Sequence, residues 1–240
     1  MGKLYRNRDL LLLGLAILGD LYIWSVTAKS RMIRNLNRDP FAPPIKYTGA
    51  LRTAVSRLFR TGMIEKTITR GQAVWQLTGS GNNYLQRTFP LLKWQEKKWD
   101  GVWRIVIFDI KINRNWLRNK LRRQLRELGF GQWQKSVYVS PHDVAEDIKE
   151  FLEAENLIGQ AAVLECRELW PNNQEKIERM WHLDQVNRMY RSIVENHGKI
   201  GYKNLKAKYL EIIAADPFLP KEFLPQPWFG DKARMVITKV

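Results

Sequence analysis

The chain has 240 residues, of which 45% are apolar, so it can form one large domain or two to three small ones and is too apolar to be disordered throughout. Its single cysteine, Cys166, excludes an intrachain disulfide and fits a reducing compartment. Forty basic against 24 acidic residues give a net charge of +16, and residues 1–100 alone hold 17 basic and 6 acidic side chains. We therefore expect a polyanionic partner, nucleic acid before a membrane surface.

An apolar run from Leu10 to Leu18 follows three basic residues at the start of the chain, as it does in a secretory signal peptide. Nine apolar residues are too few to span a bilayer, and Asp9 and Asp20 bracket the run. Apolar side chains instead recur at helical spacing on two faces, formed by Leu11, Leu15, Leu18 and Tyr22 and by Leu10, Leu13, Ile17 and Leu21. We therefore predict a core helix from Leu10 to Ile23, capped by Asn7, in a cytoplasmic protein without a membrane anchor.

A helix is predicted from Thr48 to Gly62, after a helix at 27–37 and a proline-rich link at 39–44. Its apolar stripe consists of Leu51, Val55, Leu58 and Phe59. Its other faces carry Arg52, Thr53, Ser56, Arg57 and Arg60. By itself this pattern fits an ordinary surface helix, but it also fits a reader of the DNA major groove. Arginine can donate two hydrogen bonds to guanine, and serine or threonine can bond bases or phosphates.

A short hairpin is predicted directly after this helix, with strands at 65–69 and 73–77. A basic helix followed by a basic hairpin is typical of the winged helix-turn-helix, in which Lys66 and Arg70 would lie near phosphates. We predict that residues 1–95 form a winged-helix domain that binds double-stranded DNA. The predicted DNA-binding residues are Arg52, Thr53, Ser56, Arg57, Arg60, Lys66 and Arg70.

The pattern of the middle segment, residues 96–169, is strand, helix, extended segment, helix, strand. The elements are expected at 102–110, from Asn113 or Asn115 to Leu128, at 132–141, at 144–157 and at 161–166. This order predicts a ferredoxin-like α/β sandwich. The first helix is basic and the second acidic, which fits either pairing between protomers or two solvated faces.

Asp109, at the end of the first strand, is the one catalytic candidate. A carboxylate there can bind Mg²⁺ with a second carboxylate, or it can bond the backbone that follows it. No second carboxylate accompanies it, and His142, His182 and His197 are scattered without the spacing of a zinc site. We predict no catalytic residue, no metal and no cofactor.

Residues 170–240 are predicted to form a helical domain, with helices at 173–181, 184–196 and 202–214. The proline-rich run from Asp216 to Gly230 cannot be one helix. We expect it to wrap over a surface with Phe218, Phe223 and Trp228 tucked in. The whole chain is therefore predicted to be of the α+β class.

Three stretches, in this order along the chain, resemble the PaaX family of phenylacetyl-CoA-responsive repressors of phenylacetate degradation. They are residues 50–58, which are similar to that family's recognition helix, residues 103–110 with 128–131 and 136–141, and residues 216–220 with Leu224-Pro225 and Trp228. The resemblance implies a winged-helix head, a ferredoxin-like middle domain, a helical tail, a homodimer, and repression that is relieved by a small acyl-CoA or similar effector.

The middle segment also resembles the small ferredoxin-like nuclease subunit of the CRISPR adaptation complex. That resemblance implies that Asp109 would be a metal ligand. The alternatives to a repressor are therefore a metal-dependent nuclease and a scaffold that binds duplex DNA with little sequence preference.

Overall fold

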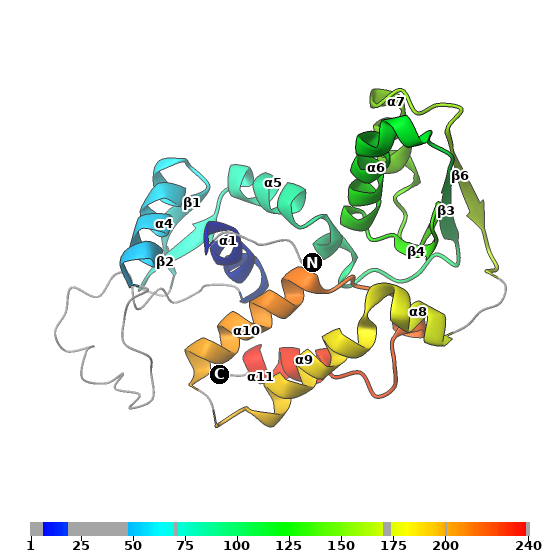
Figure 1. The fold of residues 1–240 in the computed structure, drawn as a ribbon. Helices are drawn as coiled ribbons and strands as arrows, with labels where there is room; N and C mark the ends of the chain where they lie inside the picture. Colours follow the sequence, from blue (N-terminus) through cyan, green and yellow to red (C-terminus); the bar gives the residue numbers. More distant parts are fainter. Residues whose placement is uncertain (1–6, 19–47, 70–71, 170–173, 200, 239–240) are drawn as a thin grey trace. The chain divides into compact units, whose positions relative to one another are not determined.

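The computed structural model of the protein describes residues 7–18, 48–69, 72–169, 174–199 and 201–238 (Figure 1). Helices and strands are mixed along the chain, which confirms the α+β class. Contacts divide the chain into two compact units, one of residues 1–89, 189–215 and 229–240 and one of residues 90–188 and 216–228. The division passes through a single helix, α9 (Leu183–Glu195). The sequence predicts three domains, of residues 1–95, 96–169 and 170–240, and this division stays a prediction.

The first unit begins with the buried helix that the sequence predicts. Leu12, Leu13 and Leu15 have almost no exposed surface, so this helix is buried on more than one side. Asn7, the predicted cap, is already the first residue of the helix, and the described part of the helix ends at Leu18. The predicted helix at 27–37 and the proline-rich link at 39–44 lie outside the described residues. The elements of this part are α1 (Asn7–Leu18), α4 (Thr48–Arg60), β1 (Ile64–Thr69), β2 (Gln72–Leu77) and α5 (Gly79–Thr88).

Helices from the end of the chain complete the first unit. α10 (Tyr202–Ala215) contacts both α1 and α11 (Gly230–Thr238), and the Tyr209 ring of α10 lies 6.2 Å from the Tyr190 ring of α9. The sequence correctly predicts α9 and α10 to within a residue, whereas α11 is not predicted.

The second unit has the ferredoxin-like order of strands and helices that the sequence predicts. Its four strands are antiparallel in the order β4-β5-β3-β6, with α6 and α7 in the two crossovers. The predicted extended segment at 132–141 consists of two strands joined by a turn at 135–136. The elements are η1 (Pro90–Trp94), β3 (Trp103–Phe108), η2 (Ile112–Arg114), α6 (Asn115–Glu127), β4 (Gly131–Gln134), β5 (Val137–Ser140), α7 (Ala145–Ala154) and β6 (Ala161–Cys166).

Two apolar clusters cover the two faces of this sheet. Helices α6 and α7 pack their leucine stripes against Val106, Phe108 and Tyr138 on one face. On the other face, α8 (Gln174–Trp181) and the segment 216–228 pack on Trp103 and Val139. Each fully buried side chain of this size contributes about 1.5–3 kcal/mol. Phe223, which ends η3 (Lys221–Phe223), is buried as predicted, and Phe218 and Trp228 are half-buried.

None of the helices in the described part of the chain combines the length and the apolar character that a bilayer span needs.

Candidate nucleic-acid interface

Helix α4 presents a polar front and an apolar back. Val55 and Leu58 are buried, and Thr53, Ser56, Arg57 and Arg60 are exposed. α4 contains no acidic residue, and within the described residues neither the Arg57 nor the Arg60 guanidinium makes an ion pair. Both cations are therefore available to an external anion.

The hairpin follows α4 as the sequence predicts. β1 and β2 pair antiparallel from Ile64 opposite Leu77 to Thr69 opposite Gln72. Lys66, opposite Trp75, is exposed. Arg70 lies outside the described residues, as does the side chain of Arg52, although the backbone of Arg52 is part of α4.

Ring and hydroxyl contacts hold the hairpin against α4. The half-exposed Phe59 of α4 packs edge-on against Trp75 of β2, with ring centroids 5.2 Å apart. Gly62, with φ of +67°, ends the helix, and the Thr78 hydroxyl donates a hydrogen bond to its carbonyl oxygen at 2.5 Å. Thr78 also caps α5 by accepting from the Gly81 amide. These contacts therefore fix the position of α4, and with it the position of its exposed side chains, relative to the hairpin.

The start of α5 approaches the backbone of the hairpin closely. A Cβ at Gly81 would overlap the Met63 carbonyl oxygen, so Gly81, in the first turn of α5, has a packing role. Across α1 and α5, the Tyr84 hydroxyl donates to the buried Asp9 carboxylate at 2.9 Å and accepts from the Arg8 guanidinium at 2.7 Å. These contacts connect three elements of the first unit.

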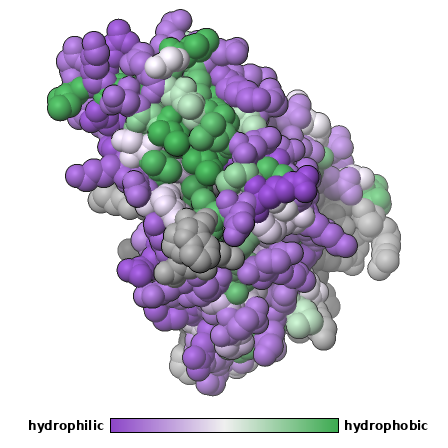
Figure 2. Space-filling model, turned by 90° about the vertical axis from the view of Figure 1, so that its right-hand side faces the viewer, coloured by the Kyte–Doolittle hydropathy of each residue, from purple (hydrophilic) through white to green (hydrophobic). Residues whose placement is uncertain are grey.

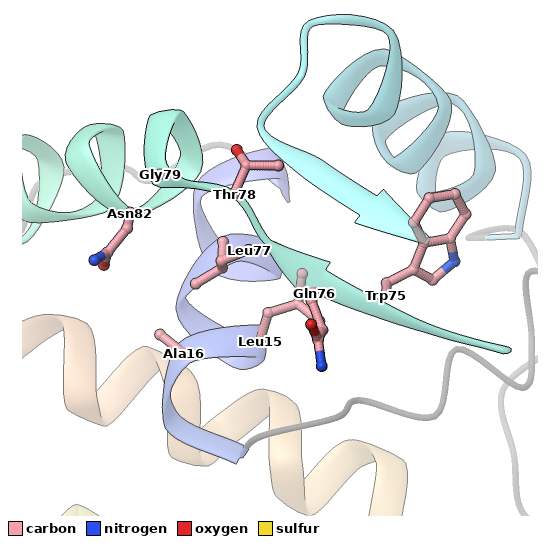
Figure 3. Close-up of a pocket in the computed structure, with 8 residues that line it drawn as sticks. All are labelled: Leu15, Ala16, Trp75, Gln76, Leu77, Thr78, Gly79 and Asn82. Carbon is pink, nitrogen blue, oxygen red and sulfur yellow. The ribbon is translucent and has the colours of Figure 1, made fainter. Parts of the chain in front are cut away.

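A groove of about 460 Å³ lies between α1, β2 and the start of α5 (Figure 3). Leu15, Leu77 and Trp75 supply its apolar wall, and Gln76 and Asn82 supply amides. No charged side chain is among the residues that line it. The groove therefore does not suit a phosphate, and it is separate from the basic front of α4.

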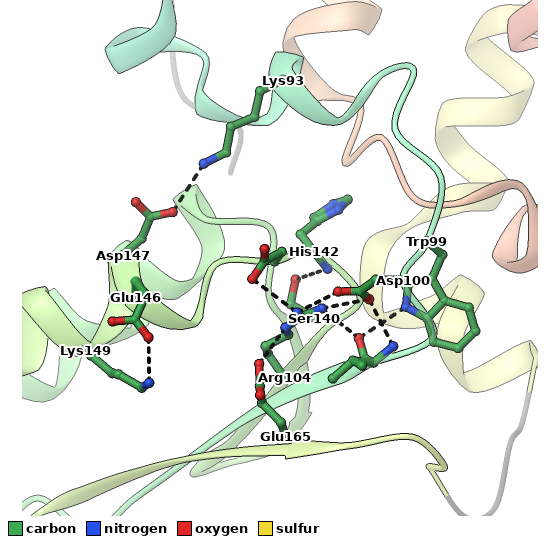
Figure 4. A network of polar contacts seen from close by, with 12 residues as sticks. Lys93, Trp99, Asp100, Arg104, Ser140, His142, Glu146, Asp147, Lys149 and Glu165 are labelled. Atoms are coloured by element: carbon green, nitrogen blue, oxygen red, sulfur yellow. Dashed lines mark hydrogen bonds and ion pairs between the residues drawn. The ribbon is translucent and has the colours of Figure 1, made fainter.

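The second unit contains a buried arginine that the sequence analysis did not single out (Figure 4). Arg104 of β3 forms ion pairs with Asp100 at 2.7 Å, Asp143 at 3.1 Å and Glu165 at 3.1 Å. Burial by itself lowers the pKa of the Arg104 guanidinium, but the bonds and charges of the three carboxylates outweigh burial and raise that pKa. Burial likewise raises the pKa of Asp100, but the bonds from Arg104 and the Val102 amide hold that pKa below its ordinary value.

His142 is the other buried ionisable group of this unit. Its ring stacks on Trp94 at 5.0 Å, and its Nε2 lies 2.9 Å from the Pro217 carbonyl oxygen. A carbonyl oxygen only accepts, so Nε2 carries the hydrogen of the neutral ring. Burial lowers the pKa of His142 to about 4. His142 also lines a cavity of about 180 Å³, together with Trp94, Trp99 and Lys97.

Asp109 lies exposed just after β3, and its amide donates to the Gln160 carbonyl oxygen at 2.8 Å. Within the described residues, no group of three or more His, Cys, Asp or Glu side chains is placed to hold a metal ion. His182 and His197 are exposed in the turns that follow α8 and α9, and His142 is buried.

Known families match the middle and the end of this chain. A model of the PaaX protein central Cas2-like domain matches residues 96–178, and a model of the PaaX-like protein C-terminal domain matches residues 202–240. The chain belongs to the PaaX family. The transcriptional repressor PaaX of Escherichia coli (strain K12) is 22% identical to it over 213 residues, which are 79% of this chain and 67% of that protein. The resemblance predicted from three short stretches is thereby confirmed.

A solved structure supports the fold of this PaaX-family chain. The uncharacterized protein Rv0674 from Mycobacterium tuberculosis has a TM-score of 0.51 and 18% sequence identity to it, over 80% of this chain and 79% of that one. At this identity the likeness concerns the fold alone.

Sequence reasoning missed Arg104 and its carboxylates. The signal was a single cation in the strand 103–108, whose other residues are all apolar. A buried arginine needs anionic partners. The sequence thus shows that partners must exist, although it does not show which acids they are.

Proposed function

We propose that this PaaX-family protein is a cytoplasmic, sequence-specific DNA-binding repressor of transcription. In this proposal α4 is the recognition helix of a winged helix-turn-helix, and the β1–β2 hairpin is its wing. The observation that carries the proposal is the acid-free, exposed front of α4, with an apolar back fixed to the hairpin. The protein acts by binding rather than by catalysis.

Each predicted site residue has a role in this proposal. The side chains on α4 enter the major groove, where arginine reads guanine edges and serine or threonine bonds bases or phosphates. The hairpin contacts the backbone or the minor groove. The residues on α4 are Arg52, Thr53, Ser56, Arg57 and Arg60, and those of the hairpin are Lys66 and Arg70.

Binding to a labelled fragment of the protein's own promoter region, against random duplex at near-physiological salt, tests the proposal. Nanomolar binding to the promoter fragment alone is expected. Arg57→Ala should weaken that binding by about 1–3 kcal/mol. Arg179→Ala, which removes an exposed arginine paired with Glu175 in the other compact unit, is the matched control. Equal affinities of the Arg57 variant and the control would show that α4 does not read the operator.

The proposed repressor is a homodimer that reads a palindrome, with half-sites one or more helical turns of about 34 Å apart. Figure 2 shows an apolar area within a mostly hydrophilic surface, on the side where β6 lies in Figure 1. Ile107 and Leu164, 41% and 47% exposed on neighbouring strands of the second unit, are large apolar side chains on this sheet. Such a face fits a self-complementary contact.

The oligomeric state can be measured by light scattering during size-exclusion chromatography. Leu164→Lys should give monomers, because it places a charge in the proposed contact. Met235→Lys, at a similarly exposed apolar residue of the first unit, should leave the dimer intact. Dimers in both variants would place the contact elsewhere.

We also propose that a small acyl-CoA-like effector releases the DNA. The cavity beside His142 supports this proposal because aromatic rings and lysine ammonium groups line it together. Phenylacetyl-CoA, the effector that the family resemblance implies, is the probe. It should release promoter DNA from the wild type and release it less readily from Lys97→Gln than from the control Lys221→Gln. Unchanged DNA binding of the wild type at millimolar probe would refute this effector.

A further inference from the structure

The outer face of α6 carries a second basic surface, in the compact unit that does not contain α4. Leu117, Leu121 and Leu125 of this helix are buried against the sheet. The opposite side of the helix presents exposed residues at spacings of three, four and three, namely Trp116, Asn119, Arg123 and Arg126. Lys111 and Arg114, also exposed, precede the helix.

Three other cations of α6 have structural partners within the unit. Arg118 donates to the Ile110 carbonyl oxygen, and Arg122 donates to the Lys135 carbonyl oxygen at 3.0 Å. Lys120 pairs with Glu155 at 2.6 Å. These three side chains brace α6 against its neighbours, so they explain only part of the charge of the helix.

The remaining four cations include Arg126, whose charge acts on the buried Tyr138 hydroxyl but is not neutralised by it. Lys111, Arg114, Arg123 and Arg126 make no ion pair with any described residue, although Glu127 follows Arg123 by four positions. In α8 and α9, by contrast, the exposed arginines are paired at this same spacing. They are Arg179 with Glu175, Arg188 with Asp184 and Arg191 with Glu195.

We propose that this outer face of α6 contacts the phosphate backbone of double-stranded DNA, in addition to the contacts of α4. The proposal rests on the proposed function for its ligand, and charge complementarity carries it: Arg123 and Arg126 on the outer face of α6, and Lys111 and Arg114 just before the helix, make no ion pair with a described residue. From Trp116 to Arg126 the stripe runs for about 15 Å, the axial length of about four base-pair steps. Backbone contacts of this kind add affinity without adding sequence preference.

Other occupants fit this face less well. The apolar side of α6 is buried in the core, so the helix has no apolar face to place in a bilayer. The acidic helix α7 of a second copy is the other candidate, but two of its four acids, and a third acid just after the helix, are already paired. Glu146 pairs with Lys149, Asp147 with Lys93, and Glu155 after the helix with Lys120.

The test compares two double variants of the full-length protein that lose the same charge. Arg123→Gln with Arg126→Gln removes two cations of the proposed surface, and Arg179→Gln with Arg188→Gln removes two ion-paired cations of the same unit. Affinities for the promoter fragment and for random duplex are measured by fluorescence anisotropy between 50 mM and 300 mM salt. Circular dichroism and light scattering report folding and oligomeric state.

The α6 variant should lose about 5-fold in affinity per contact at 0.15 M salt, equally on both duplexes, and its salt slope should fall by about 0.9 for each contact. The control should keep the wild-type slope. The proposal is overturned if the α6 variant has the salt slope and affinity of the control. It is also overturned if the α6 variant loses the dimer while its salt slope is unchanged, and the face would then belong to the contact with a second copy. If the wild type does not prefer the promoter, the proposed function fails, and the slope on random duplex still decides whether α6 binds DNA.

Discussion

Acid should destabilise the second unit through His142. The pKa of this ring is about 4 in the folded protein and 6.5 in its ordinary state, so the unfolded chain takes up the proton first. Stability is therefore complete above pH 6.5 and is lost as the pH falls toward 4. A difference of this size is worth about 3.4 kcal/mol at most, and about 2 kcal/mol of it is lost between pH 8 and pH 5.

His142→Gln provides the reference, because an amide does not titrate here and can still donate to the Pro217 carbonyl oxygen. Hydrogen exchange of the β3 and β5 amides gives the free energy of unfolding of this unit separately from that of the other. Between pH 8 and pH 5 the wild type should lose about 2 kcal/mol more than the variant. Equal losses in the two proteins would show that His142 is not buried as a neutral ring.

Three further predictions concern the stability of each unit and the alternative hypothesis of a metal-dependent nuclease. Arg104→Met should lower the free energy of unfolding by about 1–3 kcal/mol at pH 7. This loss should shrink below pH 3.8, the ordinary pKa of Asp100, because a carboxyl group whose pKa is lowered in the folded protein stabilises the fold only while it is ionised. Urea unfolding at pH 7 and pH 3 measures both effects. Gly81→Ala should unfold the first unit, whereas Gly79→Ala, whose Cβ would meet nothing within 4 Å, should not, as circular dichroism can show. Asp109→Ala should bind promoter DNA like the wild type, and neither should shorten it with Mg²⁺ or Mn²⁺; cleavage by the wild type alone would establish a nuclease.

Local periodicity predicted most elements because their apolar faces are local. The four-residue spacing of Leu117, Leu121 and Leu125 reflects one buried side of α6, and the β-branched run of β1 reflects a strand. α11 was not predicted, because its nine residues follow a proline-rich run and only Ala233 and Ile237 are buried. A short helix with two buried side chains gives little periodic signal.

Contacts between distant residues could not be predicted in the same way. The acids that neutralise Arg104 stand 4, 39 and 61 residues from it, and only the fold of the sheet brings them together. The grouping of α10 with α1 is of the same kind, because each helix has an apolar face that could pack on many partners. Sequence spacing describes what one element presents, and the partner depends on the topology of the whole chain.

The distribution of charge among the helices shows how much of a binding site can be inferred from the sequence. In α8 and α9 each exposed arginine pairs with an acid four residues away, so the bases there are matched within their own helices. α4 has three arginines and no acid, and α6 has five basic residues and one acid at its end. Like charges on one helix repel each other, and a helix without compensating acids tolerates this cost when an external anion offsets it. The ratio of bases to acids within a helix, which the sequence displays, therefore marks helices whose charge needs a partner outside the helix, either elsewhere in the fold, as Lys120 has in Glu155, or in a ligand.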